Sequence, residues 1–229
     1  MGGQACVLYG AAEFSRDLDL ALLPDPANLE QLDGALRALD ATPIGVPPLS
    51  LAHLQAGLAV HFRCRREEVL GLRIDIMTHM RGVAPFVDLW ARRTTFTFSD
   101  DTIDVMALPD LVAAKKTQRD RDWPMIRRLV DANYLNHRLE PTPERVHFWL
   151  RELRTPELLI EAVNAHRDAA DAISLDRGLL RGGAGGLTVD ALARALHEEE
   201  MAERQRDAAY WKPRREQLER LRRDAAHRP

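Results

Sequence analysis

Three short runs near the N-terminus are rich in Leu, Val and Ile and have the composition of β-strands. They cover residues 18–23, 59–64 and 72–77. The last two are separated by a polar turn that ends at Gly71, a pattern typical of a β-hairpin. Between the first two, residues 28–39 place leucines three and four positions apart, which predicts a helix packed on the sheet. The segment at residues 42–50 contains three prolines and is expected to be a loop.

From residue 109 onward, almost every segment has the spacing of a charged amphipathic helix. Pro109 and Asp110 suit the first turn of a helix, because a fixed φ and a negative charge both fit there. Further helices are predicted at residues 122–136, 143–153, 156–173, 188–209 and 214–226. The glycine-rich run at residues 181–186 is expected to be a linker. We therefore divide the chain into a core at residues 1–108 and a helical C-terminal region at residues 109–229.

The charge and hydropathy of the chain restrict the kinds of function that it can have. The 229-residue chain has 32 basic and 35 acidic residues, so it lacks the global positive field of a generic nucleic-acid binder. The end of the chain, from Lys212, is locally basic. It either binds RNA phosphates or forms a solvated helical face. No run approaches the roughly 20 apolar residues that span a bilayer, and no basic residue precedes the apolar start. We expect no membrane role and a cytoplasmic location.

Isolated acids in the apolar runs are the main chemical signal. Asp17 and Asp19 alternate with leucines, so on a strand both carboxylates project to one side. Such carboxylates repel each other unless one is protonated or a cation lies between them, and hard oxygen ligands suit Mg²⁺ or Mn²⁺. Asp75 lies between two isoleucines, where a lone buried charge would be costly, so we expect it to face the same metal site. Alternating acids also occur on exposed strands, which is the plainer interpretation.

A glycine pair precedes these acids. The order of Gly2-Gly3, then Asp17-Leu18-Asp19-Leu20, then a third acid at Asp75 resembles the nucleotidyltransferase superfamily whose best-known member is DNA polymerase beta. It is most similar to the bacterial abortive-infection toxin branch. A later helix of that branch is matched here by Asp110, Leu111, Lys115, Lys116, Arg119, Arg121 and Asp122.

The resemblance covers about residues 1–136. It implies an α+β protein, with a nucleotidyltransferase core of a small mixed β-sheet and packed helices, followed by the helical C-terminal region. The family has a strand ahead of the glycine pair, so we expect that the natural start lies upstream or that the core sheet lacks an edge. Comparing this chain with an N-terminally extended one would test this expectation.

The implied activity is a nucleotidyltransferase reaction of the EC 2.7.7 type. A nucleoside monophosphate would pass from an NTP to an acceptor hydroxyl, with release of pyrophosphate. Asp17 and Asp19 would bind both metal ions, whereas Asp75 would complete the acceptor-side ion and help to deprotonate the nucleophile.

Four further residues are expected at the nucleotide. Gly2 and Gly3 lack Cβ atoms, so their backbone N–H groups can approach phosphate oxygens closely. Lys115, rather than the neighbouring Lys116, would neutralise phosphate charge by the family register. Ser15 either binds a phosphate or only initiates the turn into the strand.

Two alternatives remain open. The family likeness favours tRNA or protein as the acceptor, but a small molecule such as an aminoglycoside would serve the same chemistry. The chain could instead be a non-catalytic relative that binds nucleotide or a partner protein, for example a cognate antitoxin in a toxin–antitoxin pair. A calorimetric titration with Mg²⁺ and NTP would separate the enzyme from the partner-binding module.

Overall fold

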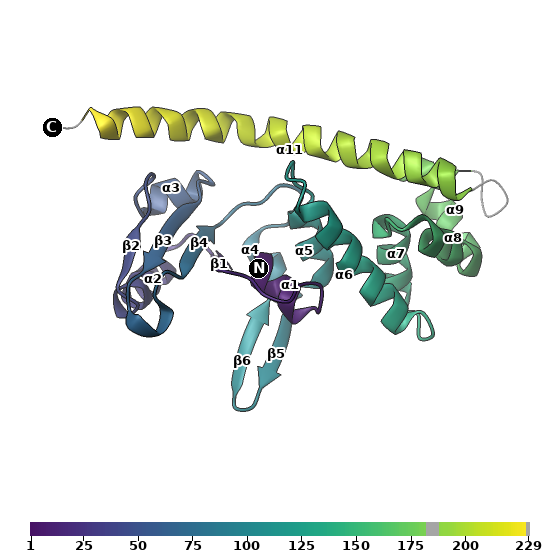
Figure 1. Cartoon of the computed structure of the whole chain (residues 1–229), viewed down its shortest axis with the longest axis horizontal. Coiled ribbons are helices and arrows are strands. Elements are labelled where there is room, and N and C mark those ends of the chain that lie inside the picture. The colour runs from purple at the N-terminus through teal and green to yellow at the C-terminus, as the bar shows by residue number, and fades with distance from the viewer. Residues whose placement is uncertain (182–187, 228–229) are drawn as a thin grey trace. The chain divides into compact units, whose positions relative to one another are not determined.

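The computed structural model describes residues 1–181 and 188–227, and Figure 1 shows the order of their helices and strands. The chain divides into two compact units. The first unit comprises Met1–Ala114 and Ala208–Pro229, and the second comprises Lys115–Asp207. The long helix α11 (Val189–Ala226) contributes residues to both units. The glycine-rich run that we expect to be a linker falls mainly at residues 182–187, outside the described residues.

The first unit contains a four-stranded mixed sheet, as expected. The strands lie in the order β1 (Asp17–Ala21), β4 (Arg73–Met77), β3 (Val60–Cys64) and β2 (Ala41–Pro43). β1 runs parallel to β4, whereas the β3–β4 and β2–β3 pairs are antiparallel. The predicted hairpin is therefore confirmed as β3 and β4, and the first predicted strand as β1.

One face of this sheet forms the core of the unit. Every second residue of β3 and β4 is buried there, and the helices α2 (Pro26–Ala38) and α3 (Leu51–Gln55) contribute Leu36 and Leu54. Burying each such side chain stabilises the fold by about 1.5–3 kcal/mol. The start of α2 is set locally, since the side chain of Asp25 accepts a hydrogen bond from the backbone N–H of Asn28 at 3.0 Å.

The other elements of the first unit include a hairpin that the apolar pattern did not reveal. β5 (Thr94–Phe98) and β6 (Asp101–Val105) form a separate two-stranded ribbon, visible in Figure 1. Its alternation of Thr with Phe is a strand signal, but few of its residues are buried, so no apolar run marks it. The unit also contains α1 (Gly2–Leu8), a 3₁₀ turn (Glu67–Val69), α4 (Phe86–Ala91) and α5 (Leu108–Lys115).

The second unit is built of helices, as predicted for the C-terminal region. Trp149 is fully buried at its centre, and Tyr134 meets it edge-on at 5.1 Å. The indole N–H of Trp149 donates to Oδ1 of Asn133 at 2.8 Å, so the polar edge of the ring is also satisfied. Its elements are α6 (Asp122–His137), α7 (Pro143–Glu152), α8 (Pro156–Ala165), α9 (Arg167–Ile173), a 3₁₀ turn (Gly178–Leu180) and α11 up to Asp207.

Three predicted boundaries are wrong. The expected helix at residues 156–173 is two helices, because the backbone of His166 leaves the helical region (φ −134°, ψ 54°). The expected loop at residues 42–50 begins with strand β2, which accommodates Pro43 because it lies at the edge of the sheet.

The two charged helices expected at residues 188–209 and 214–226 are one helix, α11, with Pro213 inside it. A proline removes one backbone donor and leaves a carbonyl of the preceding turn without its partner. Arg214 and Arg215 donate to the carbonyls of Tyr210 (3.4 Å) and Ala208 (2.9 Å), on either side of Ala209, whose carbonyl loses its helical partner at Pro213.

None of the helices in the two described stretches combines the length and the apolar content that crossing a bilayer requires.

Candidate functional site

The register of β1 against β4 gathers the predicted acids on one face of the sheet. Asp19 is the direct neighbour of Asp75, and Asp17 is the direct neighbour of Arg73. Registered neighbours on adjacent strands project to the same face, so all three aspartates share one face. The leucines and isoleucines between them project to the opposite face and contribute to the core. We call this polar surface the acidic face.

Asp75 is held firmly within the acidic face. Its Oδ1 accepts a hydrogen bond from Nε of Arg73 at 2.7 Å and lies 2.8 Å from Nδ1 of His61 on β3. Only 14% of the side chain is exposed. Burial raises the pKa of this carboxyl group, but the hydrogen bonds and charges of His61 and Arg73 outweigh it, so the pKa lies below its ordinary value. Asp75 is therefore ionised at neutral pH.

Arg73 supplies positive charge to all three carboxylates. Its hydrogen bond to Asp75 raises the pKa of the guanidinium, and the negative charges of Asp75, Asp17 and Asp19 add to the rise against the opposing effect of burial. A guanidinium thus provides, within the chain, one of the positive charges that the sequence pattern ascribes to a metal ion.

The glycine pair lies against the acidic face because it has no side chains. A Cβ atom on Gly2 would lie 1.8 Å from Oδ2 of Asp19, and one on Gly3 would lie 2.3 Å from Oγ of Ser15. Gly2 also has a positive φ of 67°, which favours glycine. The backbone N–H of Gly3 donates to Oδ2 of Asp19 at 3.3 Å. The glycines therefore position Asp19, whereas the phosphate contacts expected of them stay a prediction.

Ser15 organises the turn that leads into β1. Its hydroxyl donates to the backbone carbonyl of Asp17 at 3.1 Å, and its own carbonyl accepts a hydrogen bond from Nε2 of Gln4 at 3.0 Å. These contacts match the turn-initiating role that the sequence left open beside phosphate binding. They also join the start of α1 to the start of the strand that carries the acids.

Lys115 lies at the end of α5 and is the first residue of the second unit. Its Nζ is 3.3 Å from Oδ1 of Asp122, whose Oδ2 accepts from the hydroxyl of Thr117 at 2.6 Å. These contacts of Lys115 lie within the second unit, so its predicted role at the phosphates stays a prediction.

The acidic face has the donor chemistry of a divalent-cation site, but one of its three carboxylates, Asp75, is already paired with Arg73. Three carboxylates on neighbouring strands are the oxygen ligands that Mg²⁺ and Mn²⁺ prefer. Within residues 1–181 and 188–227, no three His, Cys, Asp or Glu side chains are arranged ready to hold a metal ion. The donor set therefore fits a hard cation on the condition that Arg73 releases Asp75.

The sequence interpretation missed Arg73 and His61. Arg73 precedes Asp75 by two residues, so the alternation of β4 alone places the two on one face. His61 is the registered neighbour of Asp75 on β3, which only the pairing of the predicted hairpin could have indicated.

Comparisons of this chain with protein-family models, with curated proteins and with solved structures found no match.

We predict that Gly3→Ala destabilises the fold while Gly34→Ala stabilises it. Both glycines lie inside helices, but a Cβ at Gly3 meets Ser15, whereas a Cβ at Gly34 meets nothing within 4 Å. The clash should cost about 1–3 kcal/mol, and the helix-favouring effect at Gly34 should stabilise by about 0.5–1 kcal/mol. Urea unfolding of both variants measures this; equal effects would contradict the close approach of α1 to Ser15.

We also predict a pH-dependent stability contribution from Asp75. Because the pKa is lower in the folded state, this contribution is fully present above the ordinary value of about 3.9 and is lost as the pH falls through the folded-state pKa. Asp75→Asn should therefore lower the free energy of unfolding by about 1 kcal/mol at neutral pH, after allowing for the partial exposure of Arg73.

Urea unfolding measured from neutral pH down to below the ordinary carboxyl pKa of about 3.9 tests the prediction. The difference between Asp75→Asn and the unchanged protein should shrink as the carboxyl group protonates. Asp33→Asn is the matched control, because Asp33 is an exposed carboxylate that also pairs with an arginine, Arg37. A pH-independent difference for Asp75→Asn would refute the ion pair.

Proposed function

We propose that this chain is a metal-dependent nucleotidyltransferase that moves a nucleoside monophosphate from an NTP to an acceptor hydroxyl. The observation that carries the proposal is the parallel register of β1 and β4, which puts Asp19 beside Asp75 on the face that also holds Asp17. Three carboxylates on one face of a sheet, beside a helix that starts with glycines, supply the ligand types that in-line nucleotidyl transfer requires of a protein. Retention of all three acids supports an enzyme over an inactive relative.

The reaction balances as a substitution at the α-phosphorus. The acceptor oxygen forms a new bond to that phosphorus, the bond to the oxygen bridging the α- and β-phosphates breaks, and pyrophosphate leaves with the electron pair. The acceptor proton passes to a base. Mg²⁺ or Mn²⁺, when bound, would neutralise the triphosphate and lower the pKa of the acceptor hydroxyl.

The three aspartates would hold the cations, and the contacts of each aspartate favour a different role. A carboxyl group with a lowered pKa is a good ligand but a weak base, so the environment of Asp75 favours a ligand role over proton abstraction. Asp19 is oriented by the N–H of Gly3. Arg73 would leave Asp75 for the phosphates, so that a divalent cation held by Asp75 would take the place of a monovalent guanidinium.

The remaining partners extend the same proposal. Gly2, Gly3 and Ser15 would border the triphosphate, and Lys115 would neutralise it after leaving Asp122. We propose tRNA or protein as the acceptor and a cognate antitoxin as a regulatory partner, in the cytoplasm. A small-molecule acceptor of the aminoglycoside kind is the alternative within the same chemistry.

One observation favours a second, non-catalytic function. Arg73 forms an ion pair with Asp75, and Nδ1 of His61 lies within hydrogen-bond distance of the same carboxylate, so Asp75 already has a structural role in the sheet. A protein of this kind would bind a nucleotide or a partner protein without turnover.

We predict that Asp17→Asn and Asp19→Asn abolish nucleotidyl transfer while leaving the fold intact. Each change removes a ligand charge that counts most in the transition state, so the rate should fall at least about a hundredfold. The measurement is incubation with each labelled NTP and a cell extract, with Mg²⁺ or with a chelator, followed by assay of label in RNA, protein and small molecules. Asp33→Asn is the exposed control and should remain active. Activity at the unchanged level in either site variant would refute the assignment.

We predict that Arg73→Met strengthens the binding of Mn²⁺ by the protein alone. The change removes the cation that competes for the three carboxylates, so the dissociation constant should fall about tenfold. Calorimetry without nucleotide measures this, independently of any activity. Arg37→Met, which removes an exposed arginine paired with Asp33, is the control. Unchanged or weaker Mn²⁺ binding by Arg73→Met would mean that the acidic face is not a cation site.

A further inference from the structure

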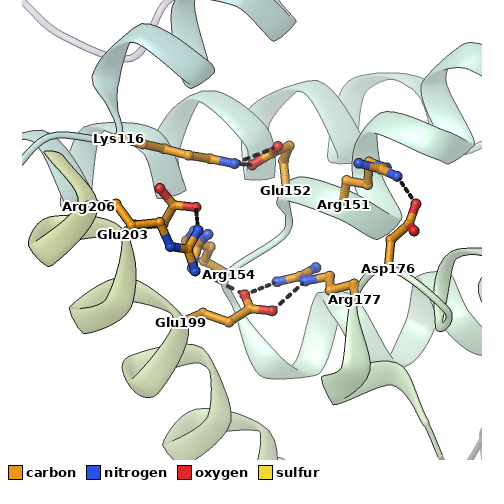
Figure 2. A pocket seen from close by; sticks show the side chains of 9 residues that line it. All are labelled: Lys116, Arg151, Glu152, Arg154, Asp176, Arg177, Glu199, Glu203 and Arg206. Atoms are coloured by element: carbon orange, nitrogen blue, oxygen red, sulfur yellow. Dashed lines mark hydrogen bonds and ion pairs between the residues drawn. The ribbon is translucent and has the colours of Figure 1, made fainter. Parts of the chain in front are cut away.

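A second cluster of charged side chains surrounds a pocket of about 200 Å³ in the second unit. None of its residues belongs to the acidic face. Figure 2 shows the side chains that line it. They come from the residue after α5, from the end of α7 and the segment after it, from the segment between α9 and the second 3₁₀ turn, and from α11. Five are basic (Lys116, Arg151, Arg154, Arg177 and Arg206) and four are acidic (Glu152, Asp176, Glu199 and Glu203).

Three of the basic groups have an acidic partner of their own. Lys116 pairs with Glu152 at 2.7 Å, Arg206 pairs with Glu203 at 2.6 Å, and Arg151 pairs with Asp176. Glu199 lies within ion-pair distance of both remaining guanidiniums. It lies 3.0 Å from Arg177 and 3.6 Å from Arg154, and the dashed lines of Figure 2 join it to both. The lining thus carries one surplus positive charge.

Arg177 is fully engaged in the fold. It donates to the backbone carbonyls of Leu150 (2.7 Å) and Leu153 (3.1 Å) and makes a two-point contact with Glu199. Carbonyls at the end of α7 lack partners within the helix, so the guanidinium caps that helix. The stronger share of the Glu199 carboxylate therefore belongs to Arg177.

Arg154 is left with incomplete bonding in a buried position. Its side chain is 7% exposed, yet neither Nε nor Nη1 has a hydrogen-bond partner. The ring of Trp123 covers one face of the guanidinium at 4.9 Å. Burial, followed by the neighbouring charge of Arg177, lowers the pKa of Arg154, and the negative charges of Glu152, Glu199 and Glu200 only partly oppose this fall. A buried charge with unmade hydrogen bonds is costly, and proteins relieve that cost by pairing the charge with a counter-ion.

We propose that this pocket binds a phosphate group carried by a small molecule, with Arg154 as the principal contact. A tetrahedral oxyanion offers acceptors to Nε and Nη1 of Arg154 and supplies the negative charge that the lining lacks. The volume suits a phosphate with at most a small organic group. The partly exposed pairs Arg151–Asp176 and Arg206–Glu203 cost little to rearrange around it.

The test is calorimetric titration of the full-length protein with inorganic phosphate, without divalent cations or NTP, at an ionic strength held constant with chloride. Failure of this site and failure of the acidic face are therefore distinguishable. We expect saturable binding by the unchanged protein and an affinity at least about tenfold lower for Arg154→Met. Arg138→Met is the matched control, because Arg138 is an arginine of the same unit that pairs outside the pocket, with Glu161.

Further arms make each outcome decisive. Glu199→Gln removes the competing carboxylate and should strengthen phosphate binding, a change opposite in sign to that of Arg154→Met. Sulfate should compete with phosphate because it has the same shape, whereas acetate should not. A simple phosphomonoester should bind like phosphate; binding of a short RNA without binding of either small ligand would overturn the assignment to a small molecule. Absence of saturable phosphate binding by the unchanged protein would overturn it whatever the folding of the variants.

Discussion

The parallel pairing of β1 with β4 is the interaction on which the acidic face depends. Each strand alone presents acids and apolar residues in alternation, and the pairing register decides whether these acids meet. With Asp19 opposite Asp75, one face collects carboxylates and the other collects the Leu and Ile side chains of the core. A slip of one residue would bury the charges and expose the apolar side chains, so hydrophobic burial itself enforces the meeting of the acids.

Such a concentration of negative charge needs a counter-charge, and the structure supplies it from within. Arg73 is placed by the same alternation that places Asp75, and His61 is placed by the antiparallel pairing of β3 with β4. The network stabilises the sheet in its metal-free form. It also means that a divalent ion bound by Asp75 would compete with the guanidinium of Arg73 for that carboxylate.

The second unit buries arginine side chains among its helices. Its helices bury aromatic side chains around Trp149 and carry their charges as pairs between elements, and Arg177 uses the unpaired carbonyls at the end of α7. One carboxylate, Glu199, shared between two buried guanidiniums leaves a positive charge in excess. In both units, therefore, the candidate binding sites lie where one charged group interacts with several groups of opposite charge: Arg73 with three aspartates, and Glu199 with two arginines.

The sequence by itself determined three of the four strands of the core sheet, the helix between them, the helical nature of the second half and the common face of Asp17 and Asp19. These features follow from local periodicity, because side-chain direction repeats every two residues in a strand and every three to four in a helix. It did not reveal the exposed β5–β6 ribbon, the break at His166 or the continuity of α11 through Pro213, where burial is weak or long-range contacts override local preference. Only the tertiary structure decided which charges meet: Arg73 and His61 with Asp75, Lys115 with Asp122, and Glu199 with two arginines. Those meetings depend on strand register and helix packing between distant segments, which no local pattern encodes.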